Sequence, residues 1–395
     1  MKTRNHLAQV GVVHQVDVIS NGLLDIPMLQ ILNADGTVNE QASVPDLDQQ
    51  TAVKIYETMQ YTRILDERMV AAQRQGRISF YLASTGEEAS TVASAAALES
   101  QDMIMSQYRE QGALAYRGYT TEQFMNQMFS NEREPNKGRQ MPIHYGAVEL
   151  NFMTISSPLG TQIPQATGYA YGQKMAGLDA VTICYFGEGA ASEGDFHAGL
   201  NMAAVLNSPA IFFCRNNGYA ISTPAEEQFA GDGIASRGIG YGVKTIRVDG
   251  NDALAVYAAT KKAREIALAE NCPVLVEAMT YRLAAHSTSD DPTGYRSKEE
   301  EAKWQDKDPI ARLGHWLEGQ GWLDKEANRK KLDQIRAEVL QELKQVEQVP
   351  VCVVDEIVKD VFAEVPWHLE EQLNDLKEHI KKYPEAYPAT AGRID

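Results

Sequence analysis

The chain has 395 residues, 37 lysines and arginines against 54 aspartates and glutamates, and a formal net charge of −17. This acidic balance argues against nucleic acid or an anionic membrane surface as the main partner. It does not exclude an anionic cofactor, because nearby arginines and a bound metal, rather than the net charge of the chain, determine the electrostatic potential inside a binding site. The sequence has no apolar stretch of membrane-spanning length and no secretory signal, so we expect no membrane partner.

The predicted elements divide the chain into three parts. Residues 1–49 have weak periodicity and predict an N-terminal arm that packs on a neighbouring subunit or is partly mobile. Residues 50–345 begin with a long helix candidate and continue as alternating strands and helices. Residues 346–395 are charged, helical in pattern and interrupted by prolines. We therefore expect a doubly wound parallel α/β sheet over residues 50–345, followed by a helical C-terminal tail.

The most informative segment begins at residue 180. Residues 180–186 (AVTICYF) and 210–214 (AIFFC) are continuous apolar runs, which predict two strands buried on both faces. The helix between them is expected to start with Ser192 as its N-cap. Its face towards the sheet should consist of Phe196, Gly199, Leu200 and Ala203.

Polar residues follow both strands. Glu188 lies in the turn after the first strand, and Asn217 follows the second. Because ligands of open α/β sheets bind at the carboxyl ends of the strands, these two oxygen donors are expected close together, and they suit Mg²⁺ carrying a diphosphate. Gly187 and Gly189 should let backbone N–H groups approach a phosphate, and Arg215 is placed to pair with it. The segment therefore predicts a metal–diphosphate site.

Each half of this pattern also has an ordinary interpretation. A Gly-x-Gly after a strand is common in α/β proteins, and Asn-Asn-Gly is commonly a turn. A dinucleotide fingerprint is excluded because Ser192 stands where its third glycine belongs, and the chain has no Gly-x-x-x-x-Gly-Lys-Ser/Thr phosphate loop. A Gly-Glu-Gly turn and an Asn-Asn pair joined by one βαβ unit form a combination that is rarer than either feature alone.

The joined pattern resembles the thiamine diphosphate signature, a Gly-Asp-Gly turn followed by Asn-Asn, with glutamate in place of the first aspartate. Other segments resemble the α subunit of the decarboxylase component of the branched-chain 2-oxo acid dehydrogenase complex. They are RQGRISFY (74–81), QYREQG (107–112), GRQMPIHYG (138–146), ISSPLGTQIPQATG (155–168) and YRLAAHSTSDD (281–291). The resemblance covers roughly residues 50 to 390. It implies a thiamine diphosphate-binding fold and oxidative decarboxylation of a 2-oxo acid with transfer of the acyl group to a lipoyl arm.

The resemblance implies a role for each matching residue. It assigns catalysis to His286. It places on the cofactor Gln107, Tyr108, Arg109, Ser157, Leu159, Gly187, Glu188, Gly189, Ala190, Arg215 and His286. It assigns Mg²⁺ to Glu188, Asn217 and the backbone carbonyl of Tyr219, and a K⁺ ion to Ser156, Pro158, Thr161 and Gln162.

Several of these residues also have an ordinary interpretation. By itself, Arg109 fits a surface ion pair with Glu110, and Leu159 fits core packing. The K⁺ segment also fits a helix-entry turn with Ser/Thr caps. His144, His197 and His315 are expected to be structural.

The resemblance also implies partners. No segment resembles the pyrimidine-binding half of the cofactor site, which in this family belongs to a separate β chain. We therefore expect two α and two β chains, a lipoyl-bearing transacylase as the acyl acceptor and a small 2-oxo acid as substrate. The expected location is the cytoplasm of a bacterium, or the mitochondrial matrix if the source is eukaryotic.

Two alternatives stay open: an α subunit that uses pyruvate, and a non-catalytic α/β binding module. The segments SSPLGTQ and GEGAASEGD favour the branched-chain type over the pyruvate type. A scaffold would not need Arg109, Glu188, Arg215, Asn217 and His286 together.

Overall fold

The computed structural model describes residues 15, 25–387, 393 and 394. Its centre is a seven-stranded sheet in which every neighbouring pair of strands is parallel, so the predicted parallel α/β fold is confirmed. In sheet order the strands are β1 (Met28–Leu29), β8 (Lys244–Asp249), β9 (Val274–Met279), β5 (Ala210–Asn216), β4 (Thr182–Gly187), β2 (Met103–Met105) and β3 (Phe152–Met153). A small antiparallel ribbon, β6 (Tyr219–Ala220) and β7 (Thr223–Pro224), follows β5.

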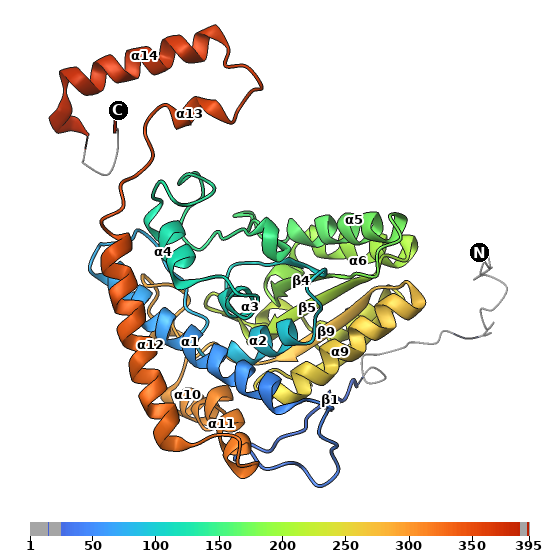
Figure 1. Cartoon of the computed structure of the whole chain (residues 1–395). Coiled ribbons are helices and arrows are strands. Elements are labelled where there is room, and N and C mark those ends of the chain that lie inside the picture. The colour runs from blue at the N-terminus through green and yellow to red at the C-terminus, as the bar shows by residue number, and fades with distance from the viewer. Residues whose placement is uncertain (1–14, 16–24, 388–392, 395) are drawn as a thin grey trace.

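Helices cover both faces of the sheet (Figure 1). One face packs on α5 (Gln162–Met175), α6 (Gly194–Leu206) and α8 (Ala235–Gly240), and the other on α2 (Glu88–Ala96) and α9 (Ala253–Glu270). Helix α1 (Gln49–Arg74) packs on α2 and belongs to the same core as this second face. Because side chains alternate along a strand, Cys184 and Phe186 enter the first core and Ile183 and Tyr185 the second. Because both faces of these strands are buried, their apolar residues occur at consecutive positions rather than only at every second one.

The remaining elements surround this centre. Helix α12 packs along α1 and α4, and α14 stands away from the main body (Figure 1). Helix α13 is linked to the segment after α4, because Lys137 pairs with Glu356 at 2.6 Å. These and the other elements are α3 (Gln111–Tyr116), α4 (Thr121–Phe129), η3 (Val148–Leu150), η4 (Ala190–Ser192), α7 (Ala225–Gln228), η5 (Pro292–Gly294), α10 (Lys298–Gln305), α11 (Pro309–Gly319), α12 (Lys325–Val346), α13 (Glu356–Lys359), α14 (Trp367–Lys382) and η6 (Pro384–Ala386). Within the described residues, no helix combines the length and apolar character needed to cross a membrane.

The βαβ unit from β4 to β5 largely follows the prediction. The buried face of α6 is Phe196, Gly199, Leu200 and Ala203, as expected. The prediction of Ser192 as N-cap is wrong: Ser192 ends the 3₁₀ turn η4, and α6 begins two residues later behind Glu193, which makes no side-chain cap. Arg215 lies inside β5 rather than beyond it, because the strand continues to Asn216.

Part of the predicted N-terminal arm contacts the sheet. Met28 and Leu29 form the edge strand β1, and the N–H groups of Ile31 and Leu32 donate to the Asp252 carboxylate at 2.7 and 2.6 Å. Residues 1–14 and 16–24 of that arm lie outside the described residues. The division into arm, α/β domain and tail stays a prediction.

Candidate active site

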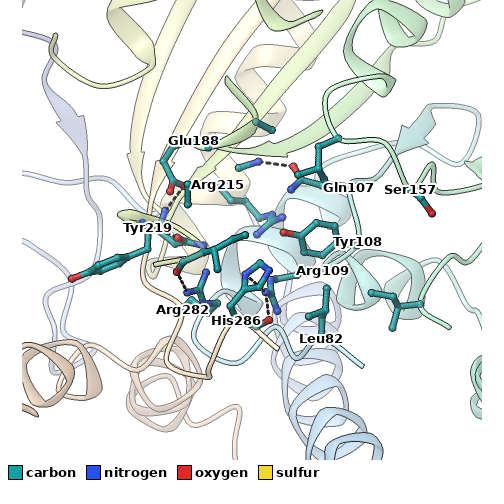
Figure 2. Close-up of a pocket in the computed structure, with 18 of the residues that line it drawn as sticks. Leu82, Gln107, Tyr108, Arg109, Ser157, Glu188, Arg215, Tyr219, Arg282 and His286 are labelled. Atoms are coloured by element: carbon teal, nitrogen blue, oxygen red, sulfur yellow. Dashed lines mark hydrogen bonds between the residues drawn. The ribbon is translucent and has the colours of Figure 1, made fainter. Parts of the chain in front are cut away.

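A cavity of about 420 Å³ opens beside the carboxyl ends of β4 and β5 (Figure 2). Its wall includes every residue predicted to contact thiamine diphosphate, and two of the predicted magnesium ligands besides Glu188. These are Gln107, Tyr108, Arg109, Ser157, Leu159, Gly187, Glu188, Gly189, Ala190, Arg215, Asn217, Tyr219 and His286. The fold thus gathers residues from five separate segments around one space, although their contacts with a cofactor stay predictions.

Glu188 has the properties of a cation ligand. Its carboxylate is 1% exposed, and Oε2 accepts a hydrogen bond from the backbone N–H of Asn217 at 3.2 Å. Its other oxygen, Oε1, is buried and has no hydrogen-bond partner among the described residues. Burial raises the pKa of Glu188 to about 7, because the ionised form loses its hydration. A bound cation would restore the lost solvation.

Asn217 is oriented by its neighbours. Its Nδ2 donates to Glu87 Oε1 at 3.0 Å, and its Oδ1 accepts from the backbone N–H of Tyr219 at 3.2 Å. Among the described residues, no group of three or more His, Cys, Asp and Glu side chains could hold a metal ion. A metal here would therefore also need amide and carbonyl oxygens, which Asn217 and Tyr219 have and which Mg²⁺ accepts.

The glycine turn depends on close packing rather than on a left-handed backbone. Gly189 has φ −62°, but a Cβ there would lie 2.6 Å from the Cβ of Ala220. The N–H of Gly187 donates to Gln107 Oε1 at 2.8 Å (Figure 2), so this group is already engaged by the protein. Gly189 therefore lets the ribbon after β5 approach the turn after β4.

Buried Arg109 and partly exposed His286 form a pair (Figure 2). Arg109 is 1% exposed and donates through Nη2 to the backbone oxygen of His286 at 2.6 Å and to its Nδ1 at 3.2 Å. The alternative of a surface ion pair between Arg109 and Glu110 is therefore wrong. Burial, together with the charges of Arg109 and Arg282, lowers the pKa of His286 to about 4, so the ring is neutral at pH 7. Because a guanidinium can only donate, Nδ1 accepts and the proton lies on Nε2.

Arg215 is held by two carboxylates. Its guanidinium is 2% exposed and pairs with Glu110 at 2.7 Å and with Glu87 at 2.9 Å. We had placed Arg215 against a phosphate, and that contact stays a prediction. A second cation that sequence reasoning missed, Arg282, lies in the same wall and donates to the backbone oxygen of Ile221 at 2.8 Å. Its Nε has no hydrogen-bond partner in the part of the chain that the structure describes.

The rest of the wall is mainly apolar. Leu159 is 43% exposed and faces the cavity, so the alternative that it merely packs in the core is wrong. Sequence reasoning missed the other apolar members, which are Phe80, Leu82, Met141, Ile143, Ala220 and Ile221. Phe80, Met141 and Ile143 lie in two of the segments that carry the resemblance, but no pattern within those segments distinguishes a cavity wall from a core.

His144 also differs from expectation. We had predicted a structural role, yet it lines the cavity, and its Nε2 lies 2.8 Å from the hydroxyl of Ser157. Its position in GRQMPIHYG, a segment that carries the resemblance, was the signal that could have indicated this.

The four residues predicted to hold K⁺ lie together before and at the start of α5. They are absent from the cavity wall. Gln162 donates to the backbone oxygen of Tyr185 at 3.0 Å. Thr161 occupies the N-cap position but makes no side-chain cap bond, so the capping explanation fails for this residue. The K⁺ site stays a prediction.

The geometry defines a class first. A parallel α/β sheet with an unsatisfied carboxylate, a carboxamide and buried arginines at the ends of adjacent strands is typical of enzymes that bind phosphorylated ligands there. Residues 56–354 match the model of the dehydrogenase E1 component family, and the chain belongs to this family. The family resemblance seen in the sequence is thereby confirmed, and membership implies dependence on thiamine diphosphate.

The chain is also similar to curated relatives over most of its length. It is 51% identical over 369 residues to the human "2-oxoisovalerate dehydrogenase subunit alpha, mitochondrial", covering 93% of this chain and 83% of the relative. The Caenorhabditis elegans protein of the same name is 52% identical over 365 residues, covering 92% and 84%. The Arabidopsis thaliana "2-oxoisovalerate dehydrogenase subunit alpha 1, mitochondrial" is 49% identical over 364 residues, covering 92% and 77%.

Proposed function

We propose that this chain is the α subunit of a branched-chain 2-oxo acid dehydrogenase. It would decarboxylate branched-chain 2-oxo acids oxidatively and acylate the lipoyl group of a transacylase. The observation that carries the proposal is the meeting of Glu188, Asn217 and the Arg109–His286 pair in one cavity of a dehydrogenase E1 component. The name 2-oxoisovalerate dehydrogenase, borne by the relatives described above, favours this substrate class over pyruvate.

The residues present fit magnesium and thiamine diphosphate. Glu188 offers a buried oxygen that has no partner within the described part of the chain, and Asn217 and the backbone of Tyr219 offer two neutral oxygens. The buried cations Arg109 and Arg282 supply positive charge beside these groups. When bound, thiamine diphosphate supplies the nucleophile and the electron sink for decarboxylation. We also propose that Ser156, Pro158, Thr161 and Gln162 hold K⁺.

The chain itself contributes a proton donor and an apolar wall. His286 presents a neutral ring whose Nδ1 is occupied by Arg109, so its Nε2–H is the group free to donate to an oxygen atom in the cavity. Phe80, Leu82 and Ile143 line the wall, exclude water and suit an aliphatic side chain.

We further propose two α and two β chains, with a lipoyl-bearing transacylase as the acyl acceptor. Helices α5 and α6, which pack together, expose large apolar side chains, as expected of a surface that another chain covers. These are Tyr169, Met175, Met202 and Val205. The relatives are named mitochondrial; we propose the matrix for a eukaryotic source and the cytoplasm for a bacterial one.

The test is decarboxylation by this chain co-expressed with a β subunit, in the presence of Mg²⁺ and thiamine diphosphate. Faster turnover of 3-methyl-2-oxobutanoate and 4-methyl-2-oxopentanoate than of pyruvate, lost in Glu188→Ala, is the expected result. A preference for pyruvate would assign the chain to the pyruvate-using type. No turnover of any substrate by the assembled complex would refute the enzyme assignment and favour a binding module.

A further inference from the structure

Glu87 lies behind the cavity wall and contacts two of its members. Its side chain is fully buried and does not line the cavity itself. Its Oε1 accepts from Asn217 Nδ2 at 3.0 Å and from Arg215 Nη1 at 2.9 Å. Glu87 is 130 residues from Asn217 in the chain, so the contact is created by the fold.

Burial alone would raise the pKa of Glu87, but the charges of Arg215 and Arg109 outweigh burial and hold the pKa below its ordinary value, so the carboxylate is ionised. Glu87 occupies the N-cap position of α2 but makes no side-chain cap, and its Oε2 is buried without a hydrogen-bond partner among the residues that the structure describes. An unsatisfied buried carboxylate oxygen is destabilising. Glu110, the other partner of Arg215, differs because its second oxygen accepts from the backbone N–H groups of Gln107 and Tyr108, both at 3.0 Å. Glu110 therefore shapes its own turn, whereas the remaining contact of Glu87 is with Asn217.

A carboxylate beside a carboxamide determines which way the carboxamide points. Because a carboxylate only accepts, the Nδ2 group of Asn217 must face Glu87 and the Oδ1 atom must face away. Oδ1 then lies towards the backbone of Tyr219, where it accepts one hydrogen bond and retains a second lone pair. The reverse orientation would place Oδ1 against the Glu87 carboxylate and direct an N–H group, which cannot bind a cation, towards the cavity.

We propose that Glu87 is a positioning residue of the metal site, which holds the Asn217 carboxamide with its oxygen available to the cation. This inference rests on the proposed function, since it assumes that Asn217 binds magnesium. Glu87 acts through Asn217 and does not contact the cofactor. Partners that orient metal ligands in this way typically contribute about 10- to 100-fold to metal affinity.

The experiment compares two neighbouring buried glutamates. Glu87→Gln keeps the size of the side chain but adds an N–H donor, so Asn217 can adopt either orientation. Glu88→Gln is the matched control: Glu88 is equally buried, but its carboxylate binds Arg63 at 2.7 Å and the N–H of Gly86 at 2.8 Å, away from Asn217. Both variants are assembled with the β subunit, and Mn²⁺ binding is measured by electron paramagnetic resonance at saturating thiamine diphosphate.

We expect Glu87→Gln to weaken Mn²⁺ binding about 10- to 100-fold, Glu88→Gln to leave it unchanged, and excess Mg²⁺ to restore kcat in Glu87→Gln. Parent-like affinity in Glu87→Gln, equal weakening in Glu88→Gln, or a kcat that excess Mg²⁺ does not restore would each overturn the inference. If Glu87→Gln does not assemble with the β subunit, Mn²⁺ binding is measured in Glu87→Asp instead. The shorter side chain should weaken Mn²⁺ binding, and unchanged Mn²⁺ affinity would overturn the inference. Failure of the parent complex to bind Mn²⁺ would instead refute the proposed function.

Discussion

The burial of Glu188 makes a quantitative prediction about metal binding and pH. Its pKa in the folded protein is about 7, against an ordinary value of 4.5, because 1% exposure leaves the charged form poorly solvated. A raised carboxyl pKa means that folding binds a proton between these two values. Protonated Glu188 therefore makes its full contribution to the free energy of unfolding of the metal-free protein below pH 4.5. About 3 kcal/mol of that free energy is lost as the pH rises from 4.5 through 7.

Metal binding should show the opposite dependence, because the cation binds the ionised carboxylate. With a pKa of about 7, Glu188 is about one-tenth ionised at pH 6 and about nine-tenths ionised at pH 8. The dissociation constant for Mg²⁺ should therefore fall about tenfold from pH 6 to pH 8, with release of nearly one proton per cation at pH 6. His286 does not contribute in this window, because its pKa is about 4.

Isothermal titration calorimetry of the assembled complex with thiamine diphosphate, in buffers of different ionisation enthalpy, measures both quantities. Glu188→Gln is the control: the cofactor's own phosphate groups titrate equally in both proteins, so the difference between them reports Glu188. The reasoning would be refuted by an affinity that does not change with pH once the control is subtracted, or by equal proton release from both proteins.

Three further predictions concern single residues. Arg109→Lys loses the planar group that binds the His286 backbone and ring together, and kcat/KM in the decarboxylation assay should fall about 10- to 100-fold; near-parental kcat/KM would contradict the proposed role. Phe213→Ala, in the fully buried centre of β5, should lower the free energy of unfolding by about 3–5 kcal/mol in urea titration, whereas Met202→Ala on the exposed face of α6 should change it little; equal effects would contradict the placement of the core. Asp252→Ala removes the cap of α9 and the acceptor for two N–H groups after β1, and it should cost about 2 kcal/mol or more, with faster hydrogen exchange near residues 31 and 32; unchanged exchange would argue against that link.

The sequence was sufficient to predict the parts of the site that lie on one βαβ unit. The strands β4 and β5 are apolar throughout because both faces are buried, and this signal is local. Glu188 and Asn217 follow directly from where those strands end. The buried face of α6 was also predicted correctly, because it too follows from the spacing of apolar residues within one short segment.

The remaining features depend on contacts between distant segments, which a single sequence does not show. Glu87 pairs with Arg215 although the two residues are 128 positions apart in the chain. The sequence therefore predicted that Arg215 binds a phosphate but gave no sign that a carboxylate pairs with it. Arg282 and His144 enter the cavity from segments that carry the family resemblance, but nothing local in those segments distinguishes a cavity residue from a structural one. Ser192 was a reasonable cap by residue type, but the chain forms a 3₁₀ turn before α6 begins. Residue roles thus depended on tertiary packing, whereas strand positions did not.

The most direct test of the account is a crystal structure of the assembled complex with Mn²⁺ and thiamine diphosphate, with the cation located by its anomalous scattering. We expect one peak, bonded to the Glu188 carboxylate, to Asn217 Oδ1 and to the backbone oxygen of Tyr219. A cation bound elsewhere, or a cofactor bound in this cavity without contact between the cation and Glu188, would contradict it.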